Sequence, residues 1–199
     1  MKENESEWLV RVLEGDDQAF TRLVENYQRP VYNLCYRMLG NAGDAEDAAQ
    51  ESFLRAYKSI NRYDPKRSFA TWLLSIASHY CIDQLRKRRF TTFSIDDEDH
   101  AWLVPPDPGP NPESTLNKRE KEAQVQELLG NLGPKDRAAV IMRYWYNYSY
   151  EEIADALSMT ISAVKSRLHR ARKNLALDWQ SQQAQDITAE RIRHESPAF

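Results

Sequence analysis

The sequence predicts an all-α fold of two small helical domains joined by a proline-rich acidic linker, the second domain containing a helix-turn-helix. Apolar residues recur at helical spacing on both sides of residues 90–114, a stretch that holds five of the nine prolines and no lysine or arginine. We expect a first domain at residues 1–89, an extended linker at 90–114, a second domain at 115–179 and a polar tail at 180–199.

The composition indicates a folded protein without a cofactor. The hydrophobic fraction of 41% is enough for a core, and the glycine-rich phosphate-binding loops are absent. No apolar run approaches the roughly 18 residues that span a membrane. The acidic start of the chain is unlike a secretory signal. We therefore expect a cytoplasmic protein with no membrane insertion, in which Cys35 and Cys81 are buried thiols.

Charge is distributed unevenly along the chain, although the formal net charge is only −3. Residues 55–89 hold nine basic and two acidic side chains, whereas the segments on either side of this block are acidic. A concentrated basic segment is the electrostatic footprint expected of a protein that binds a polyanion. On charge alone, a solvated helix surface explains the block equally well.

The first domain begins with two apolar helical stripes, which end near Gly15 and Gly40. The second stripe continues through Pro30, which is expected to bend its helix. A third helix begins near Asp44 with an alanine-rich inward face. Its other face follows steps of three and four through Asp44, Asp47, Glu51, Leu54 and Lys58.

Three interpretations of this acidic face stay open on the residues alone. Acidic side chains in a first turn stabilise a helix through its dipole. The same face could dock another protein around Leu54 as an apolar anchor. Clustered carboxylates, Glu46 included, could also bind a divalent metal ion, which would make the chain a metal-dependent enzyme acting on nucleic acid.

A fourth helix follows Ser68, a good N-cap, and ends in the basic run of residues 86–89. The loop before it, residues 61–67, is basic and contains Tyr63. Basic side chains that follow phosphates, together with rings that stack on bases, are typical of single-strand nucleic-acid binding. Phe69 is better explained as a core residue, and Trp72 fits either role.

Residues 149–175 carry the sharpest motif. Ser149 and Glu152 form a capping box before a short helix, and Ser158 begins a tight turn into a second helix. An apolar stripe at positions 164, 168, 171 and 175 buries one side of that second helix. Its other side holds five basic residues and no acid between Thr160 and Lys173, as expected of a helix that enters a major groove.

The helix before this motif is expected to begin with Pro134 at its first position and to end at Asn147, which tolerates the left-handed conformation. His169 is not expected to bind a metal ion, because no second ligand is suitably spaced.

Three segments in this order resemble one known family. Residues 44–56, 68–73 and the pair 149–154 and 164–172 are similar to the second-region, melting-segment and fourth-region signatures of bacterial RNA polymerase sigma factors of the extracytoplasmic-function group. The resemblance implies a two-domain sigma factor, without catalytic residues, that directs core polymerase to a subset of promoters in a stress or envelope response. Its implied partners are the clamp helices and flap of core polymerase, promoter DNA and an anti-sigma factor.

The resemblance also assigns residues to three surfaces. The surface facing the polymerase clamp would consist of Asp44, Asp47, Gln50, Glu51 and Leu54. The surface that melts and holds the −10 element would consist of Arg62, Tyr63, Lys66, Arg67, Trp72, His79, Arg86, Lys87 and Arg88. The surface that reads the −35 element would consist of Ser162, Lys165, Ser166, Arg167, His169, Arg170, Arg172 and Lys173.

A second hypothesis is a stand-alone helix-turn-helix regulator whose N-terminal domain senses a ligand or dimerises. Such a regulator would bind duplex DNA by itself with a steep salt dependence. A sigma factor of this group would need core polymerase for tight and specific binding.

Overall fold

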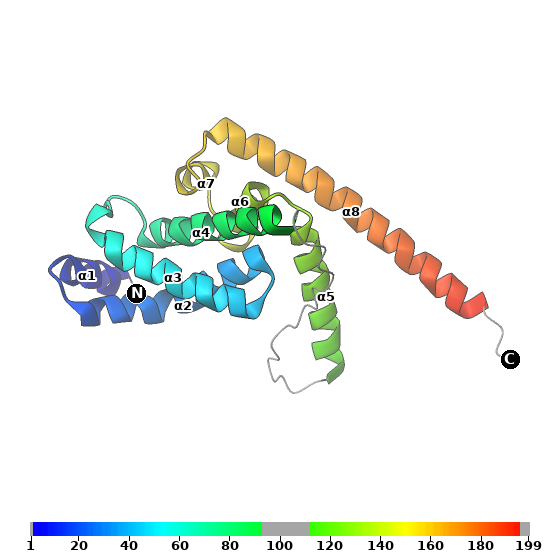
Figure 1. The fold of residues 1–199 in the computed structure, drawn as a ribbon, viewed down its shortest axis with the longest axis horizontal. Coiled ribbons are helices and arrows are strands. Elements are labelled where there is room, and N and C mark those ends of the chain that lie inside the picture. Colours follow the sequence, from blue (N-terminus) through cyan, green and yellow to red (C-terminus); the bar gives the residue numbers. More distant parts are fainter. Residues whose placement is uncertain (1, 93–111, 196–199) are drawn as a thin grey trace.

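The computed structural model describes residues 2–92 and 112–195, and within them the chain is helical with no strand (Figure 1). This confirms the all-α class. The elements in order are α1 (Lys2–Leu13), α2 (Asp17–Leu39), α3 (Ala42–Ser59), the 3-10 turn η1 (Ile60–Arg62), α4 (Phe69–Thr92), α5 (Pro112–Gly130), α6 (Pro134–Trp145), α7 (Tyr150–Ala156) and α8 (Ile161–Glu195).

The first unit, α1 to α4, is a bundle built around α2, which contacts α1, α3 and α4. Its core is formed by fully buried apolar side chains such as Leu34, Met38, Phe69 and Leu73, so the expectation that Phe69 is a core residue is confirmed. α2 continues as one helix through Pro30 and ends at Gly40, whose φ of 76° is left-handed. Such a C-terminal glycine closes a helix without the steric cost that a Cβ would bring.

The two cysteines lie against each other inside this bundle. Cys35 on α2 and Cys81 on α4 are both fully buried and free, as expected. A hydrogen bond with Cys35, together with burial, raises the pKa of the Cys81 thiol. Both effects keep the sulfur protonated, so these thiols act as packing groups.

The second unit, α5 to α8, contains the helix-turn-helix in α7 and α8. Ser149 and Glu152 form the expected capping box: the Glu152 amide donates to Ser149 Oγ at 3.1 Å, and the Ser149 amide donates to Glu152 Oε2 at 2.8 Å. Asn147 and Ser158 adopt left-handed φ values of 53° and 51°, which turn the chain before and after α7. Pro134 occupies the start of α6, as its fixed φ favours.

The ends of the expected linker and tail need correction. α4 continues to Thr92 because no proline interrupts it, and α5 begins at Pro112 because proline is tolerated in a first helical turn. The expected linker of residues 90–114 is therefore helical at both ends, and residues 93–111 lie outside the described residues. α8 runs on to Glu195 and projects from the body, because residues 180–195 contain neither proline nor glycine (Figure 1).

The two units pack against each other. α6 contacts α2 and α4, α7 contacts α4, and α5 contacts α2. Arg137 of α6 is buried at 8% exposure and donates to the carbonyl of Met38 at 2.5 Å and to that of Gly130 at 2.6 Å. Burial lowers the pKa of this guanidinium to about 10, and the carbonyl oxygens at the two helix ends compensate its charge. The second unit, small for a domain, thus gains buried surface from the first.

Candidate nucleic-acid interface

The outer face of α3 presents an apolar anchor between polar groups. Leu54 is 54% exposed although it is a leucine, and Gln50 and Asp47 are exposed one and two turns before it. A groove of about 500 Å³ runs beside this face, between α2 and α3. Its lining consists of Val24, Gln28, Arg29, Tyr32, Glu46, Ala49, Gln50 and Phe53. The arrangement suits a helix of another protein.

Two carboxylates of the predicted acidic face are engaged within the chain. Asp44 forms a 2.6 Å ion pair with Arg88 of α4, and Glu51 accepts a 2.7 Å hydrogen bond from Arg55 Nε. The Arg55 guanidinium also lies 4.7 Å from the ring centroid of Tyr80 on α4. These contacts tie α3 to α4. The structure therefore brings Asp44 and Arg88, which the sequence assigned to different surfaces, into one contact.

The loop before α4 is organised by an aromatic cluster. The Tyr63 ring packs at 5.6 Å from Phe69 and 5.3 Å from Trp72, centroid to centroid, and its hydroxyl donates to the Arg67 carbonyl at 2.6 Å. Tyr63 is only 7% exposed, so in this structure it supports the loop from inside. The side chains of Arg62, Lys66 and Arg67 are exposed around it.

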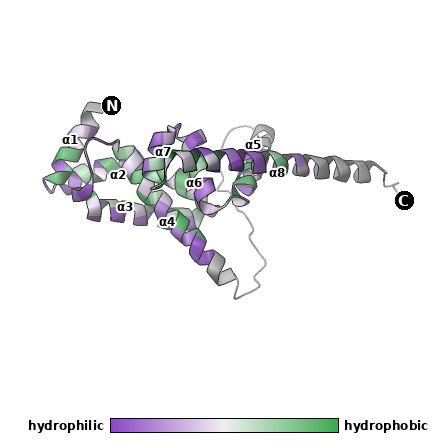
Figure 2. Ribbon diagram, turned by 90° about the horizontal axis from the view of Figure 1, so that it is seen from above, coloured by the Kyte–Doolittle hydropathy of each residue, from purple (hydrophilic) through white to green (hydrophobic). Residues whose placement is uncertain are grey.

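The remaining residues assigned to the −10 surface lie along α4. Trp72, His79 and Arg86 follow one another at seven-residue steps, which places them on nearly the same side of the helix. Trp72 is half-buried, while His79 and Arg86 are exposed. Lys87 and Arg88 are exposed on other sides. Hydrophilic residues predominate towards the end of α4 in Figure 2.

The polar side of α8 is exposed as the sequence predicts, with one exception. The exposed members are Ser162, Lys165, Ser166, His169, Arg170, Arg172 and Lys173. They lie opposite Val164, Leu168 and Ala171, which are buried against α6 and α7. The exception is Arg167, whose guanidinium forms a 2.6 Å ion pair with Asp136 of α6.

The ring of Tyr150, the first residue of α7, lies beside two basic side chains. Lys165 Nζ lies 5.5 Å and the Arg143 guanidinium 5.2 Å from the centroid of Tyr150. A cation over an aromatic face is attracted to the ring's quadrupole. Lys165 is thereby held near the start of α8, where a recognition helix touches base edges.

Metal and membrane sites receive no structural support in the described part of the chain. Within residues 2–92 and 112–195, no three His, Cys, Asp or Glu side chains come together to hold a metal ion. None of the helices there is both long and apolar enough to cross a membrane.

Comparison with known proteins identifies the family. The Sigma-70 region 2 family matches residues 23–91, and the Sigma-70, region 4 family matches residues 122–175. The ECF RNA polymerase sigma factor SigW of Bacillus subtilis is 36% identical over 175 residues, which cover 84% of this chain and 92% of the relative. The chain belongs to the ECF sigma factors. It is thus a factor of promoter recognition and transcription initiation, and the hypothesis of a stand-alone regulator is not supported.

Another relative and a solved structure agree with this membership. The RNA polymerase sigma-H factor of Pseudomonas aeruginosa is 32% identical over 86% of this chain and 92% of its own length. Among solved structures, CnrH in complex with the cytosolic domain of CnrY has a TM-score of 0.67 at 22% identity and covers 89% of this chain and 98% of that one. At that identity the likeness shows a shared fold.

Sequence reasoning missed Asp136, Arg55 and Tyr80 as residues that organise these surfaces. One signal was available for the first of them. Arg167 follows Val164 by three positions and so borders the buried stripe of α8, which indicates a partner within the protein.

Proposed function

We propose that this ECF sigma factor divides promoter recognition among three surfaces: the outer face of α3, the loop and stripe at α4, and the exposed face of α8. The exposed face of α8 carries the proposal. It gathers basic and hydroxyl side chains on a capped helix-turn-helix and leaves them free of any acidic neighbour on the same helix between Thr160 and Lys173. Arg and Lys suit guanine edges and phosphates, and Ser suits several bases.

The outer face of α3 is the proposed contact with core RNA polymerase. Leu54 is the anchor, and Asp47 and Gln50 flank it, while the neighbouring groove receives a clamp helix of the largest subunit. Asp44 and Glu51 hold α3 against α4 through their arginine partners. The second unit contacts the flap of the polymerase in this proposal.

The loop and α4 are the proposed −10 surface. Arg62, Lys66 and Arg67 surround the Tyr63 cluster and lead towards the Trp72, His79 and Arg86 stripe. Exposed cations beside a half-buried indole combine phosphate attraction with a surface on which a base can stack. The support of Tyr63 keeps the loop in place while a melted base is bound.

The chain acts by binding, with no catalytic residue and no cofactor of its own, and it works in the cytoplasm beside the polymerase.

An anti-sigma factor is also expected as a partner. A structure with the same fold pairs the sigma factor RpoE with the anti-sigma factor NepR from Bartonella quintana, at a TM-score of 0.61 and 21% identity. An anti-sigma factor would inhibit this chain by covering the α3 face or α8.

The proposal is tested with holoenzyme reconstituted from core polymerase and purified chain. Arg170→Ala is expected to weaken transcription from a cognate promoter by about 1–3 kcal/mol and to reduce discrimination against promoters changed in the −35 element. The matched control is Arg22→Ala, which removes an exposed arginine from α2. Equal weakening on all promoters would assign Arg170 to phosphate, and no change would refute its part in −35 recognition.

A further inference from the structure

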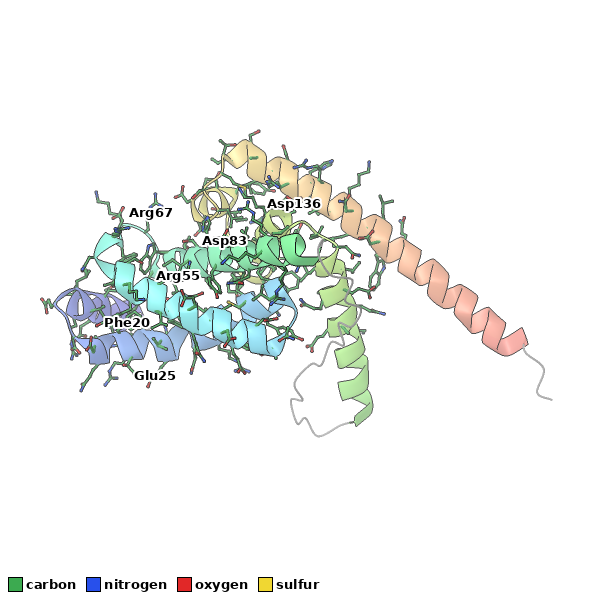
Figure 3. All side chains as sticks on the ribbon, in the orientation of Figure 1. Phe20, Glu25, Arg55, Arg67, Asp83 and Asp136 are labelled. Atoms are coloured by element: carbon green, nitrogen blue, oxygen red, sulfur yellow. The ribbon has the colours of Figure 1, made fainter. Side chains whose placement is uncertain are left out.

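Arg167 differs from the other basic residues of α8 because its guanidinium is held inside the second unit. Its Nη1 donates a 2.6 Å hydrogen bond to Asp136 Oδ1, and the two side chains are 30% and 24% exposed. Asp136 lies in the first turn of α6, between α6 and α8 in Figure 3. A carboxylate in the first turn of a helix interacts favourably with the helix dipole.

The register of α8 explains this placement. Arg167 lies three positions after Val164, which is fully buried, and directly before Leu168, which is 2% exposed. It therefore borders the side of α8 that packs on α6, whereas Lys165, Ser166 and Arg170 face away. The ion pair joins α6 to α8 at the edge of their apolar contact.

We propose that Arg167 is a positioning residue of the −35 reader, and that its pair with Asp136 sets the orientation of α8 on α6. This rests on the proposed function, since it assumes that α8 enters the major groove. The orientation decides which of Lys165, Ser166, His169 and Arg170 reach base edges. The pair thus determines sequence preference without touching a base.

Replacing Asp136 makes this inference testable, because the expected result differs between an acid that acts by its charge alone and an acid that positions α8. Removing an acid that merely lies near phosphates strengthens binding to every sequence. Removing an acid that positions the reading helix lowers the preference for the cognate sequence. The ratio of activity on the cognate promoter to activity on an altered promoter therefore falls if Asp136 positions α8 and does not fall if Asp136 acts by charge alone.

The experiment measures that ratio for holoenzymes carrying Asp136→Ala, Arg167→Ala or both, on a cognate promoter and on one altered in the −35 element. We expect each single variant to lower the ratio by about tenfold and the double variant to lower it no further, because all three lose the same pair. Asp136→Glu keeps the carboxylate and should restore most of the preference. Circular dichroism of each full chain checks that the helices are retained.

Loss of preference in Arg167→Ala with an unchanged ratio in Asp136→Ala would overturn the inference, because Arg167 would then contact bases itself. Additive losses in the double variant would overturn it as well. Failure of the proposed function is recognised separately: Lys165→Ala and Arg170→Ala would then leave the −35 preference unchanged, whatever the Asp136 variants do.

Discussion

Leu54→Ala should weaken core polymerase binding without destabilising the sigma factor. Fully burying a leucine stabilises a complex by about 1.5–3 kcal/mol. Leu54 is 54% exposed, so about half of that, roughly 0.8–1.6 kcal/mol, remains to be gained when a partner covers it. The change corresponds to a dissociation constant about 4- to 15-fold higher. Because the side chain is half in water already, the free energy of unfolding should fall far less than for a core leucine.

The assay is a competition titration in which labelled wild-type chain and unlabelled variant share a limited amount of core polymerase. Leu13→Ala is the matched control, because Leu13 is 41% exposed on α1, away from the α3 face. An unchanged dissociation constant for Leu54→Ala would refute the docking assignment. Equal weakening by both variants would show that the effect is not specific to α3.

Three further predictions concern stability. Ser149→Ala removes the Oγ that caps the Glu152 amide and should destabilise the chain by about 0.5–2 kcal/mol, read from urea unfolding, with −35 preference reduced in parallel. Leu73→Ala, at a fully buried residue, should cost about 2–5 kcal/mol in the same measurement. Burial and a hydrogen bond to Glu5 raise the pKa of Tyr27, so the stability that its neutral hydroxyl contributes is present below the usual value near 10 and is lost as pH rises above it. Urea midpoints between about pH 9 and about pH 11 should therefore fall less steeply for Tyr27→Phe than for wild type; equal slopes would contradict this origin.

Local signals predicted the fold well. The apolar stripes, the capping box at Ser149 and Glu152, and the left-handed position of Asn147 each depend on neighbours in sequence, and the structure confirms them. The ends of the linker were predicted less accurately, because no proline marks the residue at which α4 stops, and the helix continues to Thr92. The packing of the two units depends on contacts such as Tyr146 with Pro30, which are 116 residues apart and leave no periodic signal.

The exposed residues of the sites could be predicted from the sequence, but their partners within the protein could not. Exposure along α8 follows from its period, so most of that surface was recognised. The partners of charged side chains do not follow from period: Asp44 meets Arg88 and Arg167 meets Asp136 only because separate helices pack together. Tyr63 likewise looked like a stacking residue in its basic loop until its ring was placed against Phe69 and Trp72.

The most direct test of the account is run-off transcription with core polymerase, the purified chain and a pool of promoter fragments from the source genome. The account predicts specific transcripts that appear only when the chain is added and that decline when Leu54 or Arg170 is replaced by alanine. An absence of transcripts, together with tight and specific binding of duplex DNA by the chain alone, would contradict it.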